Sequence, residues 1–321
     1  MTVLATGLVA GTRALAGLAP EWRALWRQAG ASAFQSPDWL LPWWRQFGNG
    51  AARVATLRDA GQALLGVLPL YALDGRLLPI GAGATDQSDM LLAARVPADA
   101  AAALLRTALP DISVCELTEL APGAHLLGPD APPGWRLEDA PASLCPVLTL
   151  GESLEASVPA AQRRKLRMAR HRADRAGTWR AATLPPDAGI AALARLHAAR
   201  WEARDQPGGV LADPRMAAFL AEAVPALAAA GAAKVEAILF GDAVVAAALV
   251  LHAPGRRLLY LGGFDPARRF ESPGTLLIGH VIAEAIAAGA AEVDFLRGAE
   301  PYKYAWGARD RCNATRRLHR A

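Results

Sequence analysis

The stretch from Leu258 to Gly307 constrains the fold of this chain more than any other part. It opens with an apolar run at Leu258–Leu261, which predicts a buried strand, and a basic loop then leads into an apolar helix from Thr275. A second strand is expected at Val293–Leu296, directly after this helix. A strand, a glycine-containing loop, a helix and a strand in this order are typical of proteins that mix helices with a sheet.

The loop between this strand and this helix is suited to bind an anion. Free backbone N–H groups at a helix start, the helix dipole and nearby arginines all favour a pyrophosphate. Against this, Pro273 has no N–H to donate, and the loop could be an ordinary connection with its arginines in solvent. The two glycines could equally be a bulge or a simple strand end. The candidate donor-site residues are Gly262, Gly263, Arg268, Arg269, Ser272, Gly274 and Thr275.

Length and composition predict two domains. A chain of 321 residues is longer than one hydrophobic core usually organises. The stretch 121–146 is rich in Pro and Gly, as a domain junction often is. Strands and helices are expected on both sides of it, which predicts an α/β or α+β fold with mixed sheets flanked by helices. We therefore expect domains at residues 1–145 and 146–321, with a C-terminal tail that can pack on the first.

Charge and cysteine content exclude some classes of function. The net charge of +4 permits an anionic ligand but does not demand nucleic acid. Cys115, Cys145 and Cys312 form no CxxC pair, so we expect no metal site, no disulfide framework and a reducing compartment. The longest apolar run, Ala243–Leu251, is too short to span a bilayer, and the N-terminus lacks a basic region before its apolar part. These features predict a cytoplasmic protein without a transmembrane segment.

Four stretches together carry a resemblance to a known family. They are the Leu258–Gly307 segment, FQSPDWLLPWW at Phe34–Trp44, QRRKLRMARHR at Gln162–Arg172 and LHAARWEAR at Leu196–Arg204. In these stretches the chain resembles the GNAT-superfamily acyltransferases found near bacterial cellulose and exopolysaccharide genes, called BioF2-like or CelD-type. It is more distantly similar to the Fem-type aminoacyl ligases of peptidoglycan assembly. The usual GNAT loop pattern, Gln/Arg-x-x-Gly-x-Gly/Ala, is replaced here by the sequence of Arg268–Gly274.

The resemblance implies both a fold and a co-substrate. It implies two tandem GNAT-like domains, of which the first is degenerate because residues 85–89 form no obvious phosphate loop. It also implies that the second domain binds acyl-CoA, with Gly262 and Gly263 on a splayed strand against the pantetheine arm. The helix at Ile190–Arg204 would then be the acceptor-side helix, and Arg200, Trp201 and Arg204 would be its substrate-binding residues.

Lys303 is the candidate for catalysis. It lies between Tyr302 and Tyr304 after an expected strand end, and a lysine there can stabilise an oxyanion or bind a phosphate. The Fem-type resemblance implies a catalytic or donor-contacting role at this position. The alternative is a surface lysine whose stem packs on the two tyrosines. Glu300 and the Tyr302 hydroxyl are further catalytic candidates by proximity in sequence, and Tyr304 is a candidate for acceptor binding or proton transfer.

The expected helix at residues 162–175 is strongly basic. It carries seven Arg and Lys side chains against Asp174 alone. Such a run could bind an anionic acceptor, a lipid-linked sugar or a tRNA, although it is more often a solvated helix face.

We find no GxSxG, HExxH or Walker lysine loop, so hydrolase and phosphoryl-transfer functions lack support. The expected function is transfer of an acyl group from acyl-CoA to an amine or hydroxyl of a cell-envelope or exopolysaccharide precursor. Expected partners are a small-molecule or saccharide acceptor and the polysaccharide synthesis machinery. One alternative is a Fem-type, tRNA-dependent aminoacyl transferase. Another is a catalytically inactive double-GNAT scaffold of a polysaccharide synthase.

Overall fold

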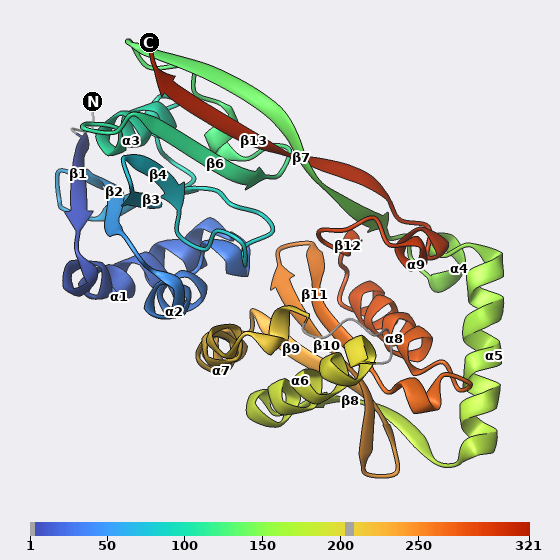
Figure 1. Ribbon diagram of the computed structural model, residues 1–321. Coiled ribbons are helices and arrows are strands. Elements are labelled where there is room, and N and C mark those ends of the chain that lie inside the picture. The colour runs from blue at the N-terminus through green and yellow to red at the C-terminus, as the bar shows by residue number, and fades with distance from the viewer. Residues whose placement is uncertain (1–3, 203–208) are drawn as a thin grey trace. The chain divides into compact units, whose positions relative to one another are not determined.

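The computed structural model describes residues 4–202 and 209–321, and the chain divides into two compact units (Figure 1). Unit 1 comprises Met1–Leu144 and Arg311–Ala321, and unit 2 comprises Cys145–Asp310. None of the helices in the described ranges is long and apolar enough to cross a membrane.

Unit 1 is a mixed sheet with helices. Its strands follow the order β1-β2-β3-β4-β6-β13-β7, with β4 parallel to β6 and the short β5 paired with β3. The strands are β1 (Leu4–Ala10), β2 (Ala51–Asp59), β3 (Leu64–Leu73), β4 (Arg76–Pro79), β5 (Leu91–Leu92), β6 (Val114–Leu120), β7 (Trp135–Thr149) and β13 (Arg309–Arg320). The helices are α1 (Thr12–Ala29), α2 (Pro37–Phe47) and α3 (Ala100–Ala108).

The start of α2 follows from local chemistry. The Ser36 hydroxyl accepts the backbone N–H of Asp38 at 3.1 Å, and Pro37 occupies the first helical position, where no N–H is needed. The helix then buries Trp39, and its indole N–H donates to the Thr85 hydroxyl at 3.0 Å.

Unit 2 is a second mixed sheet, in the order β7-β12-β11-β10-β9-β8. Its further strands are β8 (Trp179–Leu184), β9 (Ala233–Phe240), β10 (Ala243–Ala253), β11 (Arg256–Phe264) and β12 (Glu292–Asp294). Its helices are α4 (Leu154–Ser157), α5 (Ala160–Ala176), α6 (Pro186–Glu202), α7 (Pro214–Ala229), α8 (Pro273–Ala287) and α9 (Pro301–Ala305).

The two faces of this sheet are covered by different helices. Alternate residues of β9, Ile238 among them, share a hydrophobic core with α8, and Leu166 of α5 packs on the outside of α8 (Figure 1). On the opposite face, Gly189 of α6 lies directly against Val235. A Cβ at Gly189 would approach the Val235 side chain to 2.6 Å, so a glycine is needed for this helix to lie so close.

Both units repeat one order of elements. Each has a strand, two helices, a three-stranded antiparallel meander, a helix and a strand parallel to the last strand of the meander. In unit 1 this series is β1-α1-α2-β2-β3-β4-α3-β6, and in unit 2 it is β8-α6-α7-β9-β10-β11-α8-β12.

The proline-rich stretch 121–146 contains the boundary between the two units, which lies between Leu144 and Cys145. Strand β7 runs through it and contains both Pro141 and Pro146. Pro146 still accepts a hydrogen bond, from the Phe295 N–H to its carbonyl at 2.9 Å, because proline lacks only the donor. Strand β13 pairs with β6, and the C-terminal residues from Arg311 belong to unit 1.

Candidate functional site

Strands β11 and β12 of unit 2 separate at a point where an acyl donor could enter. Their parallel pairing covers Arg256 to Leu258 opposite Glu292 to Asp294, and it ends there, while β11 continues to Phe264. At the same level the register between β10 and β11 shifts between Leu249 and Val250. Such a bulge bends a strand and increases its twist, which accounts for the parting of the two strands.

Gly262 and Gly263 face opposite sides of β11 and have different surroundings. A Cβ on Gly263 would meet the backbone of α6 at 2.8 Å from the His197 nitrogen, so this glycine allows the helix to pack. A Cβ on Gly262 would find its nearest atom, the Ala247 carbonyl oxygen, 3.9 Å away. Open space beside a strand is what an extended ligand arm needs, so Gly262 is the better placed of the two for donor contact. That contact stays a prediction for both residues.

The loop from β11 to α8 is ordered by its own side chains. The Asp265 carboxylate accepts the Ala267 N–H at 2.9 Å and starts a short 3-10 turn, Pro266–Arg268. The Arg268 guanidinium lies over the Phe240 ring at 5.2 Å and within 3.8 Å of the Glu271 carboxylate, whereas Arg269 is exposed. The two arginines therefore differ: Arg268 is held, and Arg269 extends into solvent.

The entry into α8 combines a strained residue with a proline. Ser272 has φ of 55°, the left-handed region, and Pro273 follows as the first helical residue. The Ser272 carbonyl already accepts the Thr275 N–H at 2.9 Å. A Cβ placed on Gly274 would lie in ordinary van der Waals contact with the Phe264 ring, at 3.4 Å.

Lys303 is buried, with 2% of its surface exposed, and it holds the turn after β12. Its ammonium donates to the carbonyls of Leu296, Arg297 and Gly298 at 3.1, 2.8 and 2.9 Å, and the Glu300 carboxylate lies 2.9 Å away. An ammonium has three donors, so these partners saturate it. The structure thus places Lys303 as a support of the backbone, and a direct catalytic role, which stays a prediction, would require it to exchange one of these bonds.

The neighbours of Lys303 lie on the short helix α9 and its cap. Glu300 is the N-cap residue, and its carboxylate would clash at 2.6 Å with any Cβ on Gly298, whose φ is 108°. The Tyr302 ring packs edge-on against Phe295 with centroids 6.3 Å apart. The Tyr304 hydroxyl donates to Asp310 at 2.6 Å, and this bond raises the pKa of the phenol. With a raised pKa the Tyr304 phenol stays protonated at neutral pH and is a weaker acid than an ordinary tyrosine.

The acceptor-side candidates are only partly visible. The side chains of Arg200 and Trp201, at the end of α6, and the whole of Arg204 lie outside the described residues. Their roles stay predictions. His197, one turn earlier, is 6% exposed, in keeping with its backbone contact to Gly263.

A polar cluster around the buried Glu236, which sequence reasoning missed, lies on the α8 face of the sheet. The Glu236 carboxylate accepts the Thr183 hydroxyl at 3.0 Å and lies 3.3 Å from the His280 imidazole. Burial works to raise the pKa of Glu236, but these two partners outweigh it and hold the pKa below its usual value. The signal in the sequence was a lone carboxylate inside the apolar strand β9. Glu236, Ala248 and Gly262 stand in one row across three strands, so the pair shares a sheet face with the open glycine.

The corresponding loop of unit 1, between β4 and α3, is filled instead of open. Its polar side chains are buried: Thr85, Asp86, Gln87 and Ser88 are each at most 6% exposed. Asp89 accepts the N–H groups of Met90, His125 and Leu126 at 2.8, 2.8 and 3.1 Å. Burial raises the pKa of Asp89 in spite of these bonds.

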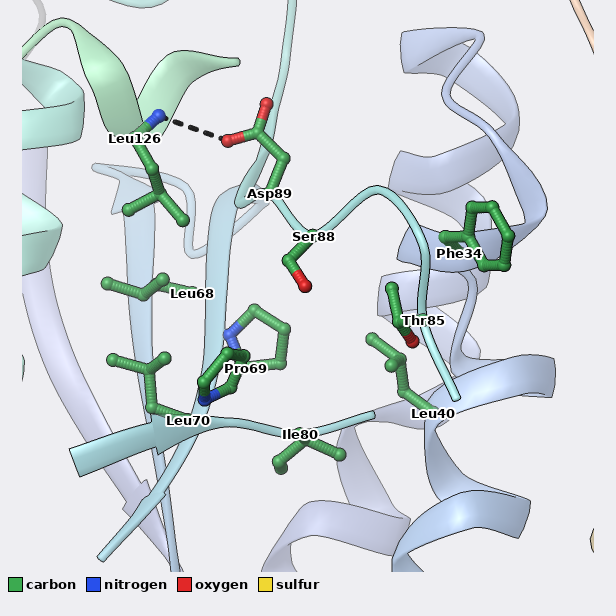
Figure 2. Close-up of a pocket in the computed structure, with 11 residues that line it drawn as sticks. Phe34, Leu40, Leu68, Pro69, Leu70, Ile80, Thr85, Ser88, Asp89 and Leu126 are labelled. Atoms are coloured by element: carbon green, nitrogen blue, oxygen red, sulfur yellow. Dashed lines mark hydrogen bonds between the residues drawn. The ribbon is translucent and has the colours of Figure 1, made fainter. Parts of the chain in front are cut away.

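The cavity beneath this loop is very small. It measures about 10 Å³, far below the ~300 Å³ at which ligand pockets begin. Figure 2 shows the Ser88 side chain pointing into it, toward Pro69, and the Ser88 hydroxyl has no hydrogen-bond partner in the described structure. The loop of unit 1 therefore has no room for a donor of the size of a coenzyme.

No group of three or more His, Cys, Asp or Glu side chains that could hold a metal ion is found within residues 4–202 and 209–321. The candidate site in unit 2 thus consists of a parted strand pair, an open glycine, a basic loop and a turn held by a lysine.

Comparisons with known proteins agree with this layout. Residues 160–304 match the family model of the acetyltransferase (GNAT) domain. No match is found among curated proteins. The match spans α5 to α9 of unit 2, and so includes the parted strands, the basic loop and Lys303.

Solved structures resemble the chain over nearly its whole length. One is the C-terminal domain (DUF2156) of a putative lysylphosphatidylglycerol synthetase from Agrobacterium fabrum, with 10% identity and a TM-score of 0.60, covering 95% of this chain and 92% of that chain. L-PGS from Bacillus licheniformis has 11% identity and a TM-score of 0.61, covering 94% and 91%. FemX has 11% identity and a TM-score of 0.61, covering 88% and 90%.

At such low identity these structures show the fold alone. They confirm the fold class expected from the sequence, a mixed α/β architecture extending through both units. The resemblance to GNAT proteins is confirmed at the level of the superfamily. Residues 160–304, which make up most of unit 2, are therefore similar to the acetyltransferase domain of the GNAT superfamily.

Proposed function

We propose that unit 2 is an acyl-CoA-dependent transferase that acylates an amine or hydroxyl. The observation that carries the proposal is the parting of β11 from β12 beside Gly262, followed by the basic loop that leads into α8. The backbone of a parted strand can pair with the amides of a pantetheine arm. The loop arginines and the helix start would then meet the pyrophosphate.

The reaction would be a direct attack on the thioester. The acceptor's nitrogen or oxygen forms a bond to the acyl carbon, the carbon–sulfur bond breaks, and the CoA thiolate leaves. The acceptor's proton passes to a base or a water relay and finally neutralises the thiolate. The Glu236–His280 pair, Glu300 and the hydroxyls of Tyr302 and Tyr304 are the candidates for this base among the described residues. A cell-envelope or exopolysaccharide precursor as acceptor, and the polysaccharide machinery as partner, remain our expectation from the family resemblance.

The donor is tested by ligand-induced stabilisation. Acetyl-CoA or a longer acyl-CoA at a hundred times its dissociation constant should add about 2.7 kcal/mol to the free energy of unfolding. Thermal shifts are measured with acyl-CoA species, CoA alone and aminoacyl-tRNA. A shift only with aminoacyl-tRNA would contradict the proposed donor and favour a Fem-type aminoacyl transferase, which the basic helix α5 and the fold similarity to FemX would suit. No shift with any of them would favour a catalytically inactive scaffold.

Variants of the two loop arginines distinguish a contact with the donor's phosphate from structural support of the loop. Arg269→Ala should weaken donor binding without changing stability, because Arg269 is exposed. Arg268→Ala should weaken both, because it also removes the contact with Phe240. The matched control is Arg167→Ala with Arg170→Ala on α5, exposed arginines of the same unit outside the loop. Donor affinity that is unchanged in both loop variants would exclude this loop as the phosphate site.

A further inference from the structure

We infer that the outer face of α5, together with the tip of the loop before α8, docks on an anionic lipid surface. We define this basic face by its exposed or half-exposed residues Arg164, Lys165, Met168, His171, Arg172, Arg175 and Phe270. The inference rests on charge and exposed apolar side chains and does not depend on the proposed reaction.

The buried and the exposed residues of α5 lie on opposite sides of the helix. Leu166, Ala169 and Ala173 are buried against α8, with at most 3% exposed. At 3.6 residues per turn, positions 164, 168, 171 and 175 fall on one stripe away from that core, with 165 and 172 beside it. The stripe and its two flanking positions therefore carry four Arg and Lys side chains and no acid.

The acids near α5 lie elsewhere. Asp174 is not part of the basic face and accepts the Trp179 indole N–H at 2.7 Å. Glu155 is 3.7 Å from Arg163, which by helical spacing also lies away from the stripe. Glu271, in the neighbouring loop, faces Arg268. The positive charge of the basic face is thus not cancelled by these carboxylates.

Two large apolar side chains project from the same surface. Met168 is 43% exposed and Phe270 is 64% exposed. The Arg172 guanidinium lies over the Phe270 ring at 4.8 Å and donates to the Phe270 carbonyl at 3.2 Å, so the ring is tied to the helix. Met168 is one turn from Arg172 on the same side of α5, so the apolar groups stand among the cations.

This combination fits a lipid surface better than RNA. An interfacial helix places its cations at lipid phosphates and its apolar side chains at the acyl boundary. Each Lys or Arg near an anionic membrane contributes about 1 kcal/mol. Contact with RNA would use the cations but would leave the thioether of Met168 without a purpose, and α5 is a convex surface without a groove for a strand.

Vesicle flotation tests the inference with the full chain. Vesicles of phosphatidylcholine containing phosphatidylglycerol should bind the protein, and vesicles of phosphatidylcholine alone should not. Binding should fall as salt rises toward 1 M, where the screening length shrinks to about 3 Å. Arg164→Gln with Arg175→Gln should weaken binding by about 30-fold, the effect of two charges at ~1 kcal/mol each.

The matched control is Arg170→Gln with Arg180→Gln, which removes the same charge from exposed residues of unit 2 outside the basic face and should bind as the wild type does. Met168→Ser with Phe270→Ser should reduce the binding that survives at high salt. Circular dichroism confirms that each variant is folded. Equal binding to both vesicle types, equal loss in the two arginine pairs, or tRNA binding through the basic face without vesicle binding would each overturn the inference.

Discussion

Two loops of this protein occupy the same place in the repeated order of elements and have opposite characters. In unit 1 the loop from β4 to α3 turns its polar side chains inward and locks them with hydrogen bonds around a cavity of about 10 Å³ (Figure 2). In unit 2 the loop from β11 to α8 is exposed, basic and preceded by the open Gly262.

The comparison shows how one architecture can support two uses. The Trp39 indole donates to Thr85, the Asn313 amide donates to the Asp86 carbonyl, and the Gln35 amide donates to the Gln87 carbonyl. Each buried polar group that finds a partner inside the protein stabilises a closed loop, whereas a loop meant for a ligand must leave its donors available. The polar residues of the first loop therefore stabilise unit 1, and those of the second can serve binding.

The largest expected effect is that of Lys303→Ala. It leaves three carbonyls that accepted charged hydrogen bonds without their partner, which should lower the stability of unit 2 by roughly 3 kcal/mol. Thermal unfolding and hydrogen exchange of the segment from β12 to α9 measure this. Lys303→Met keeps the aliphatic stem and should be similarly destabilised. If Lys303→Ala instead keeps full stability and loses turnover, the lysine is catalytic, and the turn does not depend on it.

Adjacent glycines give a sharper test of the open loop. Gly263→Ala should cost about 2 kcal/mol of stability, because its Cβ would approach the α6 backbone to 2.8 Å. Gly262→Val should leave stability nearly unchanged but raise the dissociation constant of acyl-CoA at least about tenfold, or ~1.4 kcal/mol, since it fills the open space. Chemical denaturation and calorimetric titration separate the two. Donor affinity that survives Gly262→Val would remove the main difference between the two loops.

Acid should act in opposite directions through His252 in unit 2 and Asp89 in unit 1. Burial, with help from Arg257 and Lys234, lowers the pKa of His252 in unit 2 to about 4. Below the ordinary histidine pKa of ~6.5, His252 binds a proton in the unfolded chain but not in the folded protein. The stability of the folded state therefore falls as the pH drops from ~6.5 toward 4, by on the order of 2 kcal/mol. Asp89 in unit 1 has a raised pKa, so its protonation favours the folded state as pH falls.

The pH test follows the two units by hydrogen exchange between pH 7 and about 4.5. His252→Gln should flatten the response of unit 2 and leave that of unit 1 unchanged. A response of unit 2 that persists in full in this variant would assign the effect to other groups, such as the Glu236–His280 pair.

The smallest effect is expected in the closed loop itself. Ser88→Ala removes a buried hydroxyl that has no hydrogen-bond partner, so stability should stay the same or rise by up to about 1 kcal/mol. Denaturant unfolding measures the change. Thr85→Ala is the control and should lower the stability, because the Thr85 hydroxyl accepts a hydrogen bond from the Trp39 indole. A clear loss of stability in Ser88→Ala would mean that this hydroxyl has a partner that the closed loop conceals.

Periodicity was enough for the elements that frame the site. The strand expected at Leu258–Leu261 lies in β11 and the helix expected from Thr275 lies in α8, because local hydrogen bonds and burial decide them. The composition of residues 121–146 does not reveal that β7 passes through this stretch, since proline forbids only a donated bond. The pairing of β13 with β6 could not be read from residues 309–320, because strand pairing over such a separation leaves no local mark.

For the site, the sequence by itself determined the inventory: two glycines, a basic loop, a helix start and a lysine between aromatics. Only the tertiary structure decided what each member can do. It turned Gly263 toward α6 and Gly262 toward open space. It also engaged the Lys303 ammonium in hydrogen bonds to three backbone carbonyls. It also placed His280 of α8 beside Glu236 of β9. The physical reason is that residue type sets which contacts are allowed, whereas strand register and helix approach select the partner that each side chain meets.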